Sequence, residues 1–162
     1  MRTFLFTFAL LALASCTAPP QEQGTRAVPA PIMGPFRGLP IRFDGYYRMD
    51  HGDVIRLMRF FEPGNVVLIN GTRDMEKDLP LFLVRDTKGD PARGLHNVPV
   101  NVVGDSLLFT VRPEKGEIDF HGKAMSGSLL RFLRYSHING DRLMLEYIFY
   151  PDPAVGPEPA SK

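Results

Sequence analysis

Short runs of hydrophobic residues, interrupted by turn residues, occupy most of the chain between residues 41 and 150. The runs are rich in Val, Ile, Leu, Phe and Tyr, which favour strands, and Pro63-Gly64 and Asn139-Gly140 mark two of the turns between them. Strands at spacings of about 8–12 residues are typical of up-and-down sheets that close on themselves. The pattern therefore predicts an all-β fold, an antiparallel up-and-down barrel of about eight strands.

One segment, residues 72–84, breaks this pattern. Thr72 or Asp74 could cap a short helix over residues 74–79, and Pro80 would interfere with its continuation. The sequence leaves open whether this segment forms a lid over the barrel or covers one of its ends.

Proline placement divides the chain into segments. Residues 17–40 hold six of the 15 prolines and have no sustained apolar period, and residues 151–162 hold four more. Such composition is typical of extended linkers and loose tails. Residues 41–150 hold eight Phe and all five Tyr, so we expect a single domain with one core there. A Pro-rich linker at residues 16–40 precedes this domain, and a flexible tail at residues 151–162 follows it.

The first residues have the pattern of an export signal. A positively charged start is followed by an apolar run at residues 4–13, which is too short to span a bilayer because a span takes about 20 residues. The Leu-Ala-Ser-Cys sequence that ends at Cys16 resembles the lipobox of bacterial lipoproteins. The resemblance implies that residues 1–15 are a signal peptide and that the chain's one cysteine is acylated. With Thr17 next, it also implies an anchor in the outer membrane, facing the periplasm. The alternative is an ordinary signal peptide followed by a chance cysteine.

Four segments of the expected domain resemble the lipocalin-like sheets of small bacterial lipoproteins: "FDGYYR", "RLMRFFEPGNV", "VVGDSLLFTV" and "GDRLMLEYIF". The "RFFEPG" segment also resembles a "RFFPDG"-type turn in the carboxy-terminal domain of some F-box proteins. Gly45-x-Tyr47 stands where lipocalins carry Gly-x-Trp, and this chain has no tryptophan. The resemblance implies a ligand cavity inside the barrel, and the aromatic residues available to line it are Tyr47, Phe60, Phe109, Phe120, Phe132 and Tyr147.

Charge and cysteine content narrow the function classes. Loss of Arg2 with the signal leaves 18 Lys+Arg against 18 Asp+Glu, so the mature chain is close to neutral and lacks the basic surface of a nucleic-acid-binding protein. A single cysteine excludes an internal disulfide. The sequence contains no Gly-x-Ser-x-Gly, His-Glu-x-x-His or phosphate-binding glycine loop, so we expect no catalytic residues, no cofactor and no enzyme activity.

One predicted strand carries polar residues at every second position. Glu117, Asp119, His121 and Lys123 share one face because strand side chains alternate. Carboxylates beside a histidine could bind a metal or carry acid–base chemistry, but a solvated face of a half-buried strand has the same pattern. We favour the solvated face and expect no metal site. The acidic cluster at residues 50–53 lacks the spacing of an EF-hand and indicates a polar hairpin tip.

Two pairs of arginines lie in apolar runs. Arg56 and Arg59 are three positions apart, as are Arg131 and Arg134, so the members of each pair point to opposite faces. At most one arginine of each pair can line the interior and meet an anionic ligand. Surface or rim placement is the default for such residues.

These observations leave two hypotheses for a membrane-anchored, non-enzymatic lipoprotein. In the first, the barrel holds a small apolar or amphipathic ligand, because eight strands enclose a space that either side chains or one small ligand can fill. In the second, the barrel is solid and its outer face docks an envelope protein. The large side chains on both faces of "LLRFLRY" and "RLMLEYIFY" favour this alternative.

Overall fold

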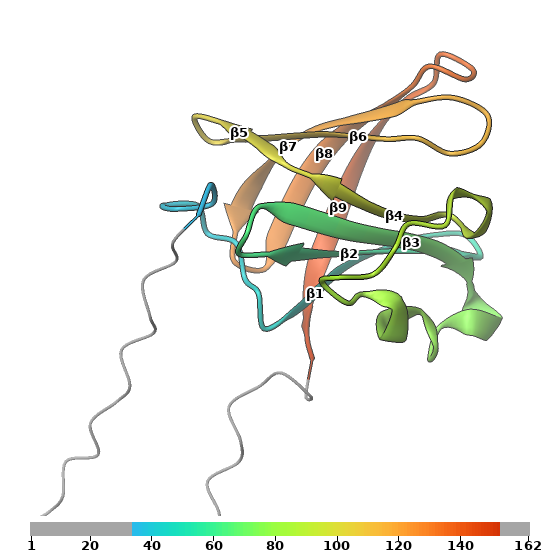
Figure 1. The fold of residues 1–162 in the computed structure, drawn as a ribbon, viewed down its shortest axis with the longest axis horizontal. Helices are drawn as coiled ribbons and strands as arrows, with labels where there is room; N and C mark the ends of the chain where they lie inside the picture. Colours follow the sequence, from blue (N-terminus) through green and yellow to red (C-terminus); the bar gives the residue numbers. More distant parts are fainter. Residues whose placement is uncertain (1–33, 153–162) are drawn as a thin grey trace, which may run out of the picture. The chain divides into compact units, whose positions relative to one another are not determined.

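The computed structural model of the chain describes residues 34–152, and β-strands make up most of this range (Figure 1). In the sheet the strands follow the order β4-β3-β2-β1-β9-β8-β7-β6-β5, and every neighbouring pair is antiparallel. The predicted all-β, antiparallel up-and-down barrel is therefore confirmed. The described strands are β1 Gly45–His51, β2 Val54–Phe61, β3 Asn65–Thr72, β4 Leu95–Pro99, β5 Asn101–Val103, β6 Ser106–Val111, β7 Ile118–Ser126, β8 Leu129–Ser136 and β9 Arg142–Pro151.

The two edge strands of this sheet, β4 and β5, are consecutive in the chain and are separated only by Val100. β4 pairs with β3 and β5 pairs with β6, while the Val100 N–H donates to the Gly64 carbonyl at 2.8 Å. Residues 95–103 thus cross from one edge of the sheet to the other and nearly close the barrel (Figure 1). The expected eight strands become nine because this one extended run is divided at Val100.

The segment between β3 and β4 packs against the outside of the barrel. Instead of one helix over residues 74–79 it forms three 3-10 turns, η1 Arg73–Met75, η2 Leu79–Phe82 and η3 Pro91–Arg93. Pro80 lies in the first turn of η2, where a missing N–H is tolerated, but it would break a helix that continued from residue 74. Leu79 and Leu83 pack on outward side chains of β2 and β3, such as Ile55. The segment therefore covers an outer face of the barrel, and β2 and β3 are apolar on both sides because both sides are covered.

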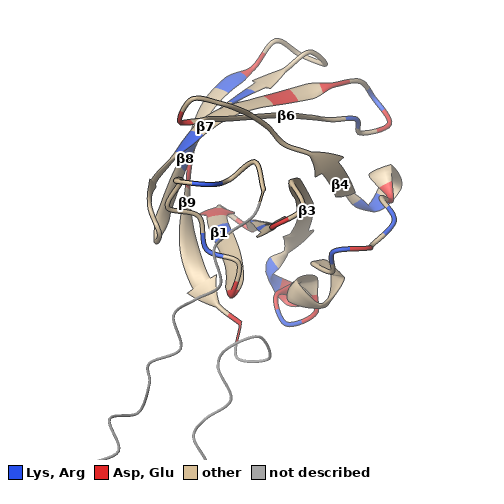
Figure 2. Ribbon diagram, turned by 60° about the vertical axis from the view of Figure 1, so that its left-hand side comes forward, with Lys and Arg blue, Asp and Glu red and all other residues tan. Residues whose placement is uncertain are grey.

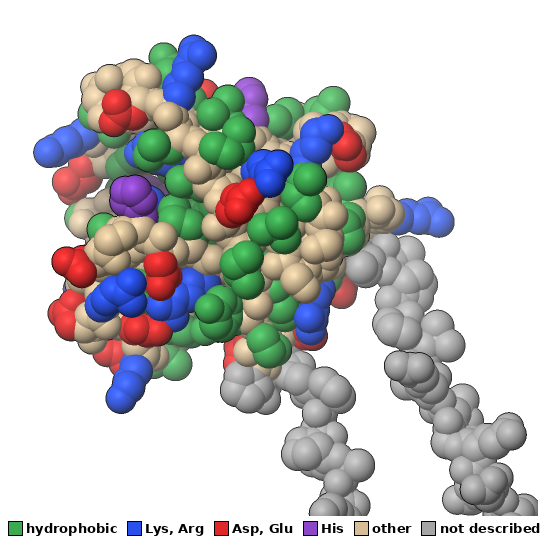
Figure 3. Space-filling view, turned by 180° about the vertical axis from the view of Figure 1, so that it is seen from behind, with side chains coloured by type: hydrophobic (Ala, Val, Ile, Leu, Met, Phe, Trp, Pro, Cys, Tyr) green, Lys and Arg blue, Asp and Glu red, His purple; other side chains and the backbone are tan. Residues whose placement is uncertain are grey.

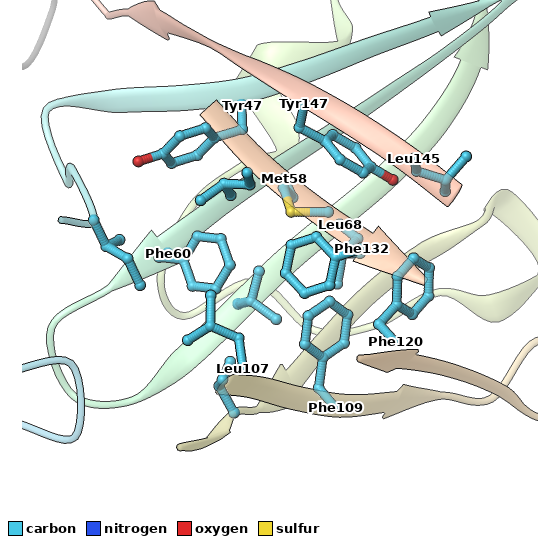
Figure 4. Packing of buried hydrophobic residues seen from close by; sticks show 14 of the residues in the cluster. Tyr47, Met58, Phe60, Leu68, Leu107, Phe109, Phe120, Phe132, Leu145 and Tyr147 are labelled. Atoms are coloured by element: carbon cyan, nitrogen blue, oxygen red, sulfur yellow. The ribbon is translucent and has the colours of Figure 1, made fainter. Parts of the chain in front are cut away.

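The inward side chains form one hydrophobic core (Figure 4). At one end of the barrel the chain before β1 closes the interior, since Phe36 is fully buried and packs edge-on against Phe60 at a centroid distance of 5.6 Å. The Tyr47 hydroxyl accepts a hydrogen bond from the Arg42 backbone N–H at 2.9 Å and donates to the Gly127 carbonyl at 3.3 Å. These contacts close that end with both apolar and polar interactions.

The packed domain extends beyond its predicted limits. Phe36 belongs to the core although it lies among the prolines that indicated a linker up to residue 40. At the other boundary, Pro151 is the last residue of β9, and the Asp152 carboxylate lies 3.1 Å from Arg59 Nη1. Cys16, the signal peptide and most of the linker and tail lie outside the described residues.

Candidate functional site

All six aromatic residues that the sequence offered as a cavity lining lie inside the barrel and are almost fully buried: Tyr47, Phe60, Phe109, Phe120, Phe132 and Tyr147. Their rings contact one another, with centroid distances from 4.8 Å for Phe109 and Phe120 to 6.2 Å for Phe132 and Tyr147 (Figure 4). Contacts of this kind are typical of a close-packed core. The middle of the barrel is therefore filled by the side chains that were expected to surround a ligand.

Polar side chains line the interior at the end opposite the Tyr47 hydroxyl. The strand register places Arg56 of β2 opposite Asn70 of β3, and His96 of β4 opposite the core residue Leu68. Arg134 of β8 lies opposite the core residue Phe120 in the same way. Because residues opposite each other on antiparallel strands share a face, the inward face of the barrel carries two arginines at this end.

The other member of each arginine pair lies outside. Arg59 is within 3.1 Å of the Asp152 carboxylate, and Arg131 is within 2.6 Å of the Glu146 carboxylate. As expected, each pair supplies no more than one inward arginine: Arg56 in the first pair and Arg134 in the second. Arg56 and Arg134 are half-buried and lie on the inward face at one end of the barrel, whereas Arg59 and Arg131 face outward.

The inward arginines line a cavity of about 130 Å³ together with Asn70, His96 and Tyr147. Neither Asp nor Glu is among the residues that line this cavity. Nη1 of Arg56 is buried and has no hydrogen-bond partner within residues 34–152. An unpartnered buried donor on a charged group is unfavourable, so this cavity, which we call the arginine cavity, is electrostatically incomplete.

The charges in the arginine cavity act on each other. Burial and the positive charge of Arg56 lower the pKa of Arg134, while Tyr147 and Asp141 act in the opposite direction. Guanidinium groups remain charged in proteins, so Arg56 and Arg134 place two positive charges in the cavity. Two like charges therefore share a small and partly buried space.

Tyr147 and His96, two of the three neutral polar side chains that line the arginine cavity, are also able to donate hydrogen bonds. Burial raises the pKa of the Tyr147 hydroxyl, with Arg56 and Arg134 acting against the shift, so Tyr147 stays protonated at neutral pH. Burial lowers the pKa of His96, which keeps its imidazole neutral with one N–H. In Figure 4 the hydroxyls of Tyr47 and Tyr147 point in opposite directions, consistent with a closed end and a cavity end. The set of donors matches an oxyanion such as a carboxylate or phosphate.

The polar face of β7 is held by neighbouring strands and turns. Asp119 accepts a hydrogen bond from the Thr110 hydroxyl at 2.6 Å and lies 2.7 Å from His137 Nε2, and these two contacts lower the pKa of Asp119. Lys123 lies 2.9 Å from Asp105, and basic and acidic residues both occur along this part of the sheet (Figure 2). Within residues 34–152, no group of three or more His, Cys, Asp or Glu side chains is arranged to hold a metal ion.

Sequence reasoning missed Asn70 and His96 as residues that line the arginine cavity. The register of β3 and β4 decides their orientation, and both strands carry large apolar residues on each face, so alternation alone gives no direction. The available signal was the two-residue spacing of Leu68 from Asn70 and of His96 from Val98, which places each pair on the same face of its strand. This spacing does not tell whether that face points into the barrel or outward.

Comparison with protein-family models, with curated proteins and with solved structures gives no match for this chain. No helix within the described range is long and apolar enough to cross a membrane.

Proposed function

We propose that this protein is a non-enzymatic binding module, attached by an acylated Cys16 to the outer membrane and facing the periplasm, whose barrel binds the anionic group of a small ligand. The observation that carries the proposal is the arginine cavity, where Arg56 and Arg134 face inward without an Asp or Glu in the lining and Arg56 Nη1 has no partner among residues 34–152. A bound oxyanion would supply the missing acceptor and the missing negative charge.

The energetics of the arginine cavity support a binding role. Leaving a buried donor unsatisfied costs about 1–3 kcal/mol, and more for a charged group. Locally unfavourable arrangements of this kind are expected at functional or strained sites. Charge-assisted hydrogen bonds from guanidinium to carboxylate or phosphate are among the stronger polar contacts, so a ligand can recover the cost of the ligand-free arrangement.

The chemistry of the arginine cavity favours binding over catalysis. Its side chains are two guanidinium groups, an amide, an imidazole and a phenol whose pKa is raised. A hydrolase site of the familiar kind needs a nucleophile beside a base that is oriented by a third group. The arginine cavity is instead lined by several hydrogen-bond donors, as expected for recognition of an anion.

Binding of butyrate and of inorganic phosphate to the mature chain tests this function. Cys16→Ser removes the acyl group for the measurement, and isothermal titration calorimetry reports affinity. Arg56→Gln and Arg134→Gln should each weaken anion binding at least tenfold, because each removes one charge from the arginine cavity. Arg131→Gln is the matched control, since it removes an outward arginine from the same strand as Arg134 and should leave binding unchanged. Equal affinities in all four proteins, or no binding of either anion, would refute the proposal.

Docking of an envelope protein is a second candidate, favoured by the outer face of β7 and β9. Met125, Met144 and Ile148 are 52%, 60% and 50% exposed, respectively. Figure 3, seen from behind Figure 1, shows hydrophobic side chains among charged ones of both signs. Under this candidate, Met144→Glu together with Ile148→Glu should abolish cross-linking to a partner while anion binding by the arginine cavity persists. Unchanged cross-linking would remove the support for this face.

A further inference from the structure

A second, larger hollow lies against the outer face of the barrel next to the arginine cavity. It has a volume of about 730 Å³, and we call it the outer groove. Ile69 and Leu95 are its buried residues, Met75 and Phe82 from the segment between β3 and β4 contribute further apolar side chains, and Lys88 is charged and exposed. A hollow of this size is in the range of small-molecule sites, which is roughly 300–1,000 Å³, whereas the arginine cavity is below it.

The outer groove and the arginine cavity meet where the pairing of β3 with β4 ends. The last residue pair of these strands is Ile69 with Leu95, and Asn70, the next residue of β3, lines both hollows. Residues 93 and 95 line the outer groove, while residues 94 and 96 line the arginine cavity. The two hollows therefore lie on opposite sides of the start of β4, with the exposed Asn70 at the edge between them.

The charges around the outer groove suit the same ligand. Lys88 has no ion-pair partner in the described part of the chain, whereas Arg93 is paired with Asp90 at 3.4 Å. Ile69, Leu95 and Phe82 make part of the groove apolar, and this part suits a hydrocarbon chain. The arginine cavity thus offers a site for a charged group, and the adjoining outer groove offers a site for an apolar one.

We infer that the ligand is an anionic amphiphile whose head group binds Arg56 and Arg134 and whose hydrocarbon part crosses the edge at Asn70 into the outer groove. This inference rests on the proposed binding of an anion in the arginine cavity. It deepens that proposal by assigning the head group to a cavity that is too small for a chain, and the chain to a groove that is large and apolar. Carboxylate and phosphate heads share the chemistry that the arginines recognise.

The test compares anions that share a head group and differ in chain length. Butyrate is compared with decanoate, and inorganic phosphate with octyl phosphate, using the mature Cys16→Ser chain and calorimetry. Each buried CH₂ should strengthen binding about fourfold, so at least one of the longer anions should bind tenfold or more tightly than its short counterpart.

Gly89→Leu is the variant that separates the two hollows. Gly89 lines the outer groove, and a Cβ there would meet its nearest neighbour, the Leu95 carbonyl oxygen, at 3.5 Å, an ordinary van der Waals distance. The larger side chain should therefore occupy the outer groove without straining the fold, which circular dichroism and thermal unfolding verify. Ser128→Leu, at an exposed position outside the groove, is the control for an added apolar side chain.

The inference predicts that Gly89→Leu removes the tenfold advantage of decanoate or octyl phosphate while leaving butyrate and phosphate binding unchanged, and that Ser128→Leu has no effect. Equal affinities for short and long anions in the unsubstituted chain would overturn the inference and leave the proposed function standing. So would a chain-length advantage that survives Gly89→Leu. Absence of binding by every anion would overturn both.

Discussion

Replacing Arg56 by methionine should make the ligand-free protein more stable. Nη1 of Arg56 is buried without a hydrogen-bond partner among the described residues, and the Arg56 charge acts unfavourably on Arg134. Removing an unsatisfied buried donor recovers about 1–3 kcal/mol, and methionine keeps most of the apolar stem that packs in the barrel. We therefore expect a net gain of about 1–2 kcal/mol in the free energy of unfolding, which moves a urea midpoint upward by about 0.5–1 M.

Equilibrium urea unfolding of the ligand-free chain measures this gain, and calorimetry with butyrate measures its functional consequence. Arg131→Met is the control, because the Arg131–Glu146 pair is about half exposed and is worth about 0–1 kcal/mol. Arg56→Met should raise stability and weaken butyrate binding at least tenfold, while Arg131→Met should lower stability slightly and leave binding intact. A loss of more than about 1 kcal/mol in Arg56→Met would show that Arg56 stabilises the fold and would refute the argument for an incomplete site.

Three further predictions concern the turn, the pH dependence and the anchor. Gly140 has a φ of +75°, so Gly140→Val should lower the free energy of unfolding by more than about 1 kcal/mol, and Gly140→Asn should lower it less. Equal losses for the two variants in urea unfolding would contradict backbone strain as the cause. Burial lowers the pKa of His96 in the folded protein. The unfolded chain therefore takes up a proton at this histidine before the folded protein does, and the free energy of unfolding falls as the pH drops from about 6.5 toward the folded-state pKa. His96→Gln should therefore show a smaller loss of stability between about pH 7 and pH 5 than the unsubstituted chain, and an identical loss would exclude His96 as the cause. Cys16→Ser in the full-length chain should give unprocessed or soluble protein in membrane fractionation and mass measurement, and a membrane-bound product without acyl mass would contradict the lipobox assignment.

The fold was predictable because its signals are local. Alternating apolar runs and the Asn139-Gly140 turn are enough to indicate an antiparallel meander, and the structure has a hairpin there, with Gly140 in the left-handed region. The start of the domain was misplaced because Phe36 and Leu39 are isolated apolar residues among prolines and glycines. The burial of Phe36 depends on a barrel end that forms from distant strands, and residues 34–40 give no sign of that end.

The candidate site was less predictable for a related reason. The spacing of Arg56 from Arg59 fixes that they face opposite ways, but the positions that alternate with them in β2 are apolar on both faces. The direction is set by the segment carrying Leu79 and Leu83, which covers the outward face of β2 and β3. Sequence alternation alone therefore gives a choice between two arrangements, and tertiary packing decides between them.

A crystal structure of the mature Cys16→Ser chain with octyl phosphate shows directly whether the arginine cavity binds an anion. We expect phosphate oxygens within hydrogen-bonding distance of Arg56 Nη1 and of the Arg134 guanidinium, inside the cavity that Asn70, His96 and Tyr147 complete. Octyl phosphate bound elsewhere, with this cavity holding water alone, would contradict the proposed function.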